Sequence, residues 1–358
     1  MVKSTITFGP QHPVFPEPIQ FILKVVDEKV VLAEPQIGYV HRGIEKAFEL
    51  NDPKDNIFLA ERICGICPAP HTTAYVRGVE SLMGIEAPPR AKYIRTIMNE
   101  LNRIHSHILW AGLLGDAIGF ESYFMQTWNY REKVLDAIEK ISGHRVTYAM
   151  NAIGGVRRDM TNEQLRGLEK TMDYVESSLE NIEDVMKDYT IKKRTQGIGI
   201  LTEEEARRDG AVGPTARASG ISQDLRTSGY DAYGDLKFEP VVVNNCDSYG
   251  RFAVRWQELK QSIDLIRQCI VKMPSGEILT KSNNPMNGEA ISRVEAPRGE
   301  LFYYIKGNGS KKLERVKVRT PTFANIIPTV TMLSKGCQVA DVSVIVLSMD
   351  PCISCTER

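Results

Sequence analysis

Two Cys-x-x-Cys pairs near the opposite ends of the chain are the residues best suited to chemistry. They are Cys64-Gly-Ile-Cys67 and Cys352-Ile-Ser-Cys355. Cysteines three positions apart on one turn can direct both sulfurs to a single point. Thiolates select soft or borderline ions such as zinc, copper(I), the iron of iron–sulfur clusters, or nickel with iron. Asp350 and the proline after it are typical of an N-cap and first helical residue, and a helix N-terminus favours the thiolate. The two pairs therefore predict one shared metal site.

A structural zinc site with four cysteine ligands is the simplest interpretation of two such pairs. Zinc modules usually separate their pairs by roughly 15–20 residues. Here Cys67 and Cys352 lie 285 positions apart (352 − 67). A site that joins the two ends of a chain is more consistent with the centre of a whole domain than with a local zinc module.

The remaining cysteines, Cys246, Cys269 and Cys337, are scattered and are expected to be small buried apolar residues. Three are too few for a separate iron–sulfur cluster, which needs four cysteine ligands. Any electrons that leave the paired cysteines must therefore pass to another chain.

Length and composition limit the class of protein. The chain has 358 residues, 42% of them apolar, which is enough for one large domain or two merged ones and excludes a disordered or fibrous chain. Its 45 basic and 45 acidic residues give no net charge, so no nucleic acid partner is expected. No apolar run reaches the roughly 18 residues of a membrane span, and the first residues lack a secretory signal. A cytoplasmic protein with reduced cysteines is expected.

Helical periodicity dominates the middle of the chain. Apolar residues recur every three or four positions in the segments 94–108, 165–185 and 252–270, as on the buried face of a long helix. Thr161 followed by Gln164 predicts a capping box that begins the second of these helices. Long amphipathic helices of this kind most simply pack as a bundle.

Strand signals lie toward the two ends of the sequence. The β-branched runs 19–26 and 30–33, joined by polar residues, predict a hairpin. A second hairpin is predicted from 301–305 and 313–318, which flank a Gly-Asn-Gly turn. The segment 197–239 is rich in Gly, Arg and Ser with little periodicity, and is expected to be a long ordered loop.

The expected fold class is therefore mainly α (α+β), with a central bundle of long helices and small peripheral β-hairpins or sheets. A single domain over 1–358 is expected. Its parts would be an N-terminal β region (1–45), a helical core (46–290) and a C-terminal β/α segment with the second cysteine pair (291–358).

Several motifs resemble the large, catalytic subunit of nickel–iron hydrogenases, and together they cover nearly the whole chain. They are Arg42-Gly-Ile-Glu45, Glu61-Arg-Ile-Cys-Gly-Ile-Cys67 with His71, Glu295-Ala-Pro-Arg-Gly299, and Asp350-Pro-Cys-Ile-Ser-Cys355. Phe8-Gly-Pro-Gln-His-Pro13 and the stretch from Gly213 to Arg226 are similar to the energy-converting, membrane-associated hydrogenases and to the quinone-site subunit of respiratory complex I. Complex I relatives lack the four cysteines. The compact length most resembles the ferredoxin-linked group often called Ech.

The resemblance implies a nickel–iron centre held by the four cysteines. Cys64 and Cys352 would be terminal nickel ligands, while Cys67 and Cys355 would bridge nickel to an iron that carries carbon monoxide and two cyanides. The implied reaction is the reversible heterolytic cleavage of dihydrogen. Cys352 would act as the base, and Arg298 would polarise the forming charges above the open site.

Other residues take implied roles around that centre. Pro297, before Arg298, belongs to the cofactor pocket, and His71 would hydrogen-bond a bridging sulfur. Asp350 would lie beside the iron, or would only cap the terminal helix. Glu17 would be the first proton relay, with a solvated carboxylate as the alternative, and His12 could serve coupling on the membrane side.

Two departures from the family's pattern are visible. Many members end in a histidine that helps bind a magnesium or iron ion with a glutamate like Glu45. This chain has Arg358 there, which predicts an Arg358–Glu45 ion pair in place of that metal. Uptake enzymes place an aspartate where this chain has Ser106. Family precursors are trimmed just past the last cysteine motif, so a processed chain would end near Arg358.

The implied partners are an iron–sulfur small subunit, ferredoxin or a ferredoxin-like subunit, and integral membrane subunits. The substrates would be dihydrogen and protons. The chain would lie on the cytoplasmic face of the cell membrane through these partners. Two other functions stay open: a complex I-like quinone-site or scaffold subunit, and a zinc-stapled helical protein without redox chemistry.

Overall fold

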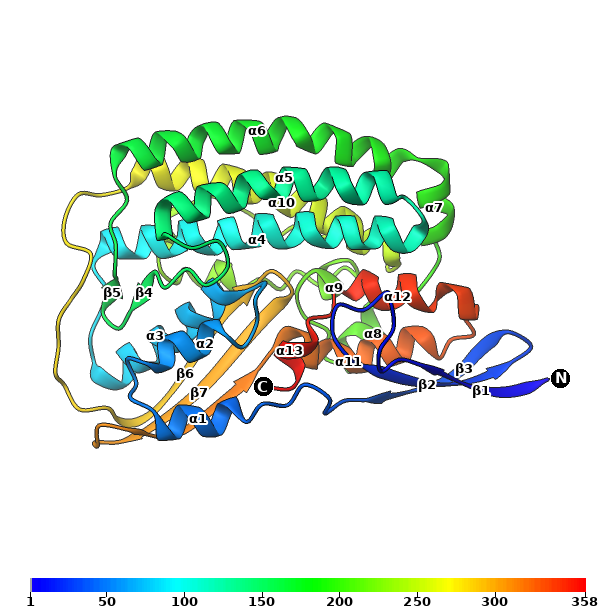
Figure 1. Cartoon of the computed structure of the whole chain (residues 1–358), viewed down its shortest axis with the longest axis horizontal. Helices are drawn as coiled ribbons and strands as arrows, with labels where there is room; N and C mark the ends of the chain where they lie inside the picture. The colour runs from blue at the N-terminus through cyan, green and yellow to red at the C-terminus, as the bar shows by residue number, and fades with distance from the viewer. Residues whose placement is uncertain (1) are drawn as a thin grey trace.

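The computed structural model describes residues 2–358, and its long helices form one side of the molecule (Figure 1). They are α4 (Pro89–Ile118), α5 (Glu121–Ser142), α6 (Asn162–Lys187) and α10 (Ser248–Lys272). Adjacent helices in this bundle contact each other, and the apolar stripes expected from the sequence are buried. The bundle, and with it the mainly helical fold class, is confirmed.

The capping box predicted at the start of α6 is present. The backbone N–H of Gln164 donates to Thr161 Oγ1 at 3.2 Å, and the Thr161 N–H donates to Gln164 Oε1 at 2.9 Å. These two bonds satisfy backbone donors that have no partner within the helix, so they fix where α6 begins.

The first predicted hairpin is part of a three-stranded antiparallel sheet made of β1 (Lys3–Phe8), β2 (Gln20–Val26) and β3 (Lys29–Gln36). Asp27 and Glu28 at the β2–β3 turn both have positive φ, 47° and 64°. Such a turn matches the natural twist of paired strands. The inner face of this sheet forms an apolar core with α11 (Pro321–Leu333) and α12 (Val342–Met349).

The second predicted hairpin is also confirmed. It consists of β7 (Gly299–Asn308) and β8 (Leu313–Arg319), and β6 (Asn287–Ala296) pairs with β7 to complete an antiparallel sheet. The tight β6–β7 turn holds Pro297 and Arg298. Gly213, at φ 63°, lies against this turn so closely that an added Cβ would be 2.4 Å from the Arg298 carbonyl oxygen. A residue with a side chain would displace that turn.

Shorter elements complete the chain. The helices are α1 (Ile44–Leu50), α2 (Asn56–Glu61), α3 (Pro68–Met83), α7 (Tyr189–Thr195), α8 (Glu203–Arg208), α9 (Gly213–Arg217) and α13 (Ile353–Thr356). The short strands and 3-10 turns are β4 (Asn151–Ala152), β5 (Gly155–Val156), η1 (Leu225–Ser228), η2 (Tyr233–Asp235) and η3 (Val339–Asp341).

The long loop expected over 197–239 is interrupted by α8, α9, η1 and η2. A capping box of Thr202 and Glu205 starts α8, and the Asp224 side chain caps η1. These elements are too short to produce apolar periodicity, which is why the sequence pattern did not reveal them.

The two ends of the chain lie in different surroundings. The N-terminal strand lies at one extremity, whereas α13 and the C-terminus lie near the middle of the molecule (Figure 1). Cys352 and Cys355 belong to the apolar core of the helical bundle and the β6–β8 sheet, and Ile353 belongs to the core under β1–β3. The last residues therefore join the two cores. Across residues 2–358, no helix has the length and apolarity needed to cross a membrane.

Candidate metal centre

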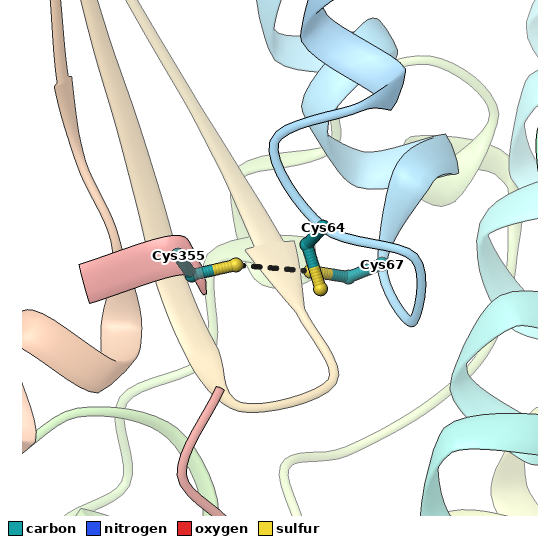
Figure 2. Close-up of side chains that lie close together, drawn as sticks. All are labelled: Cys64, Cys67 and Cys355. Atoms are coloured by element: carbon teal, nitrogen blue, oxygen red, sulfur yellow. Dashed lines mark hydrogen bonds between the residues drawn. The ribbon is translucent and has the colours of Figure 1, made fainter. Parts of the chain in front are cut away.

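The four paired cysteines meet inside the molecule. Cys64 and Cys67 lie in the loop between α2 and α3, whereas Cys352 and Cys355 lie at the start of α13 and within it. The Sγ atoms of Cys64 and Cys352 are 2.9 Å apart, and those of Cys67 and Cys355 are 3.6 Å apart. Figure 2 shows the Cys355 sulfur pointing across to Cys67. The Sγ atoms of Cys64, Cys67 and Cys355 all lie within 4.8 Å of one another.

These thiols are free and almost fully buried, with 1 to 3% of each residue exposed. Burial opposes ionisation of Cys64, but hydrogen bonds from neighbouring thiols and the charge of Arg298 bring its pKa below the usual range. Burial and the Cys352 thiolate raise the pKa of Cys355. Ionisation of one thiol thus opposes ionisation of its neighbours, because thiolates this close repel one another. All four can lose their protons only when a cation lies among them. The donor set fits a thiolate-bound metal centre.

A buried arginine and aspartate lie beside the sulfurs. Arg298 Nη2 donates to Asp350 Oδ1 at 2.7 Å, Nε donates to the Asp350 carbonyl at 2.9 Å, and Nη1 donates to Ser106 Oγ at 3.1 Å. Although burial opposes the charged form, the charges of Asp350, Cys352 and Cys67 raise the pKa of Arg298. The guanidinium therefore stays positive within the field of the sulfur cluster.

The expectation that Asp350 caps the terminal helix is wrong. Helix α13 begins at Ile353, and Cys352 is its N-cap residue without a side-chain hydrogen bond. Asp350 instead ends α12, in the left-handed region at φ 66°. Its carboxylate pairs with Arg298 in a buried, charge-assisted hydrogen bond at 2.7 Å.

His71 links the sulfur cluster to a tyrosine. Its Nε2 lies 3.5 Å from Cys355 Sγ, and its Nδ1 lies 2.8 Å from the hydroxyl of Tyr303. Burial lowers the pKa of His71 to about 4, so the ring is neutral. A neutral ring with its proton on Nε2 can donate to the sulfur while Nδ1 accepts from Tyr303.

Glu17 approaches the second cysteine pair from the N-terminal segment. The backbone N–H of Ser354 donates to Glu17 Oε2 at 2.7 Å. Burial, followed by the nearby charge of Cys352, raises the pKa of this carboxyl. His12 lines the same surface pocket, of about 390 Å³, and stacks on Phe8 at a ring-centroid distance of 4.0 Å. Glu17 thus lies between that pocket and the cysteines.

Glu45 lies in an ion-pair cluster with arginines. Arg358 Nε is 3.1 Å from Oε1, as the ion-pair prediction required, and Arg315 Nη2 is 3.1 Å from Oε2. The N–H of Val318 also donates to Oε1 at 3.0 Å. Among residues 2–358, Glu45 belongs to no group of three or more His, Cys, Asp or Glu side chains that could hold an ion. The ion pair predicted between Arg358 and Glu45 is therefore confirmed.

Several residues that hold the cysteines in place were not singled out from the sequence. Arg42 Nη2 donates to the carbonyls of Ile63 and Ser354, at 2.8 and 3.0 Å, and so ties the two cysteine segments together. The hydroxyl of Thr320 donates to the Cys355 carbonyl at 2.8 Å. Arg42 belongs to a motif that pointed to it. Thr320 follows an alternating strand and Tyr303 lies in an apolar one, and neither position has a distinguishing pattern.

Comparisons with known families agree with these motifs. The model of the respiratory-chain NADH dehydrogenase 49 kDa subunit matches residues 117–287 and 277–358, and the model of nickel-dependent hydrogenases matches residues 42–114. Together these matches cover most of the chain, and the hydrogenase match contains the first cysteine pair.

Individual relatives match over almost the full length. Membrane-bound hydrogenase subunit alpha of Pyrococcus furiosus is 41% identical, over 99% of this chain and 87% of that protein. Carbon monoxide-induced hydrogenase of Rhodospirillum rubrum is 39% identical over 100% of both chains. A solved chain of the membrane-bound sulfane sulfur reductase, an archaeal respiratory membrane complex, has 32% identity and a TM-score of 0.95, over 99% of this chain and 98% of that one. The chain therefore belongs to the family that unites the large subunits of membrane-bound nickel–iron hydrogenases with the 49 kDa subunit of respiratory-chain NADH dehydrogenase.

Proposed function

We propose that this chain is the catalytic subunit of a ferredoxin-linked, energy-converting nickel–iron hydrogenase. The observation that carries the proposal is the convergence of four buried thiols from both ends of the chain beside the Arg298–Asp350 pair. A scaffold subunit has no need for four thiols gathered at one point, because single buried cysteines pack like other small apolar residues wherever they lie. A local zinc staple has no need for a buried arginine whose charge acts on its sulfurs.

The four cysteines would hold the metals. Cys64, Cys67, Cys352 and Cys355 would together hold a centre of nickel and of iron that carries carbon monoxide and two cyanides. When bound, this centre would supply the site at which dihydrogen is cleaved heterolytically or formed. His71 would donate a hydrogen bond to the Cys355 sulfur and so reduce the electron density that the sulfur offers a metal.

Ionisable residues of the chain would accept the proton and carry it toward the surface. The Cys352 sulfur would accept it, and Arg298 would stabilise the negative charge that develops beside it. Glu17 is the next carboxyl toward the surface, hydrogen-bonded to Ser354 between the two cysteines of the second pair. Its raised pKa suits a group that both accepts and releases a proton.

Electrons would leave through other chains. Among the described residues, the cysteines outside the centre do not form a second cluster, and an iron–sulfur small subunit would take the electrons on to ferredoxin. Two of the relatives named above, the hydrogenase of Pyrococcus furiosus and the sulfane sulfur reductase, are membrane-bound. This chain would likewise sit on the cytoplasmic face of a membrane through integral membrane subunits and couple dihydrogen chemistry to ion movement.

Exchange of deuterium gas with solvent protons tests this function in the purified complex. The wild-type complex is expected to catalyse the exchange, and Glu17→Gln is expected to slow it on the order of 100-fold. Glutamine keeps an oxygen that can accept the Ser354 N–H bond but cannot carry the proton. The measurement is mass spectrometry of the gas phase.

Glu34→Gln is the matched control, because Glu34 is a half-exposed carboxylate on β3 that pairs with the exposed Lys24. Equal exchange rates in Glu17→Gln and wild type would remove Glu17 from the proton path. Absence of exchange in a metal-loaded wild-type complex would overturn the proposed function itself.

A further inference from the structure

The C-terminal end of α12 is held by two side chains from other helices. The last carbonyl groups of a helix have no partners within it. Here the indole Nε1–H of Trp110 donates to the Leu347 carbonyl at 2.6 Å. Arg255 donates from Nη1 to the Ser348 carbonyl at 3.1 Å and from Nη2 to the Met349 carbonyl at 3.0 Å. Three consecutive carbonyls are thus bound from α4 and α10.

Arg255 and Trp110 also contact each other. The Arg255 guanidinium lies over the Trp110 ring, 4.3 Å from its centroid, and both residues are about 1% exposed. A cation over an indole face is attracted by the ring, most strongly when it is desolvated. Burial lowers the pKa of Arg255 to about 10, although the charges of Asp350 and Glu258 oppose this shift.

The segment that this pair holds leads directly to Arg298. Asp350 follows the three bound carbonyls, and Arg298 is bonded both to its carboxylate and to its backbone carbonyl. Within residues 2–358, Asp350 Oδ2 and Arg255 Nε have no hydrogen-bond partner, and they lie 3.9 Å from each other. Asp350 therefore lies between two guanidinium groups, and Arg255 fixes the backbone that carries it.

We propose that Arg255, supported by Trp110, is a positioning residue that fixes the end of α12 and thereby the place of Arg298 beside the sulfur cluster. The inference rests on the proposed function for its catalytic consequence. Arg255 touches neither the cysteines nor a substrate position. Arg255 acts through the backbone from Leu347 to Asp350. This backbone leads directly to Cys352, so it also helps to place that residue.

Four variants of the intact complex test the proposal by hydrogen–deuterium exchange and by steady-state kinetics of dihydrogen oxidation. In Arg255→Met, amide exchange is expected to rise in the peptide covering 342–352 but not in 287–308. The kcat is expected to fall roughly 10- to 100-fold with KM unchanged. Arg255→Lys can restore one carbonyl bond, so its exchange and kcat should be intermediate.

Trp110→Phe keeps a ring under Arg255 but removes the hydrogen bond to the Leu347 carbonyl. Amide exchange is therefore expected to rise only over 342–352, and by less than in Arg255→Met. Arg267→Met is the control on the same helix, because Arg267 pairs with Asp173 and Glu176 at the surface. It should change neither readout.

Unchanged exchange over 342–352 in both Arg255→Met and Trp110→Phe, or an equal rise over the whole chain, would overturn the positioning role. The exchange readout does not depend on dihydrogen activity. If the wild-type complex had no dihydrogen activity, the proposed function would be wrong. A rise in amide exchange over 342–352 in Arg255→Met would still support the role of Arg255 in positioning this segment.

Discussion

Replacing Cys352 with alanine is expected to lower dihydrogen turnover on the order of 1,000-fold or more. The Cys352 sulfur lies 2.9 Å from that of Cys64, and in the proposed mechanism it both binds nickel and accepts the proton. Alanine removes both roles while leaving a buried cavity of only one atom. Dihydrogen evolution from reduced ferredoxin measures the loss, and metal analysis of the same sample shows whether nickel is still bound.

Cys337→Ala is the matched control. Cys337 is a partly buried thiol whose Sγ donates to the Leu333 carbonyl, away from the cluster, and its loss should leave turnover close to wild type. Full activity in Cys352→Ala would refute the role given to this sulfur. Equal loss in both variants would show that the chain tolerates no cysteine change, rather than that Cys352 has a special role.

The second large effect is expected from Arg298→Lys, with kcat lowered on the order of 100-fold. Lysine keeps the positive charge but cannot reproduce the three directed bonds to Asp350 and Ser106. The ammonium would therefore be displaced from the position where charge develops. Because the four cysteines remain, nickel and iron content should be unchanged, and the loss should appear in kcat.

Arg293→Lys provides the comparison, because Arg293 lies on β6, the strand that leads into the turn holding Arg298. Arg293 pairs with Glu300 through a side chain that is 46% exposed, and such pairs contribute about 1 kcal/mol or less. Its substitution should change kcat less than twofold or so. If Arg298→Lys lowered kcat no more than Arg293→Lys does, the directed hydrogen bonds of the Arg298 guanidinium would not matter for turnover.

The main elements of the fold could be read from the sequence because their signals are local. The stripe that includes Ile97, Leu101 and Ile104 repeats at the helical period over a long segment, and α4 forms there. The hairpin turns follow from residues that tolerate positive φ or tight bends. The small helices within 197–239 are one or two turns long, and only α8 and η1 begin with a side-chain cap.

The cysteines and Arg298 could be identified because their motifs carry distinctive residue types at fixed spacing. The partners that orient them could not. Tyr303 is one aromatic residue among several in β7, and its hydrogen bond to His71 joins positions 232 residues apart. The position of Asp350 was mistaken because an Asp-Pro pair usually begins a helix, whereas a buried arginine determined its conformation here. Long-range pairing of this kind leaves no periodic trace in a sequence.

Infrared spectroscopy of the purified complex, with nickel and iron analysis of the same sample, tests the central claim most directly. Stretching bands from iron-bound carbon monoxide and cyanide should be present, together with nickel, in wild type, and should be lost in Cys352→Ala. No zinc staple or quinone-site scaffold would give those bands. Zinc in place of nickel, with a spectrum empty in that region, would contradict a nickel–iron centre at these four cysteines.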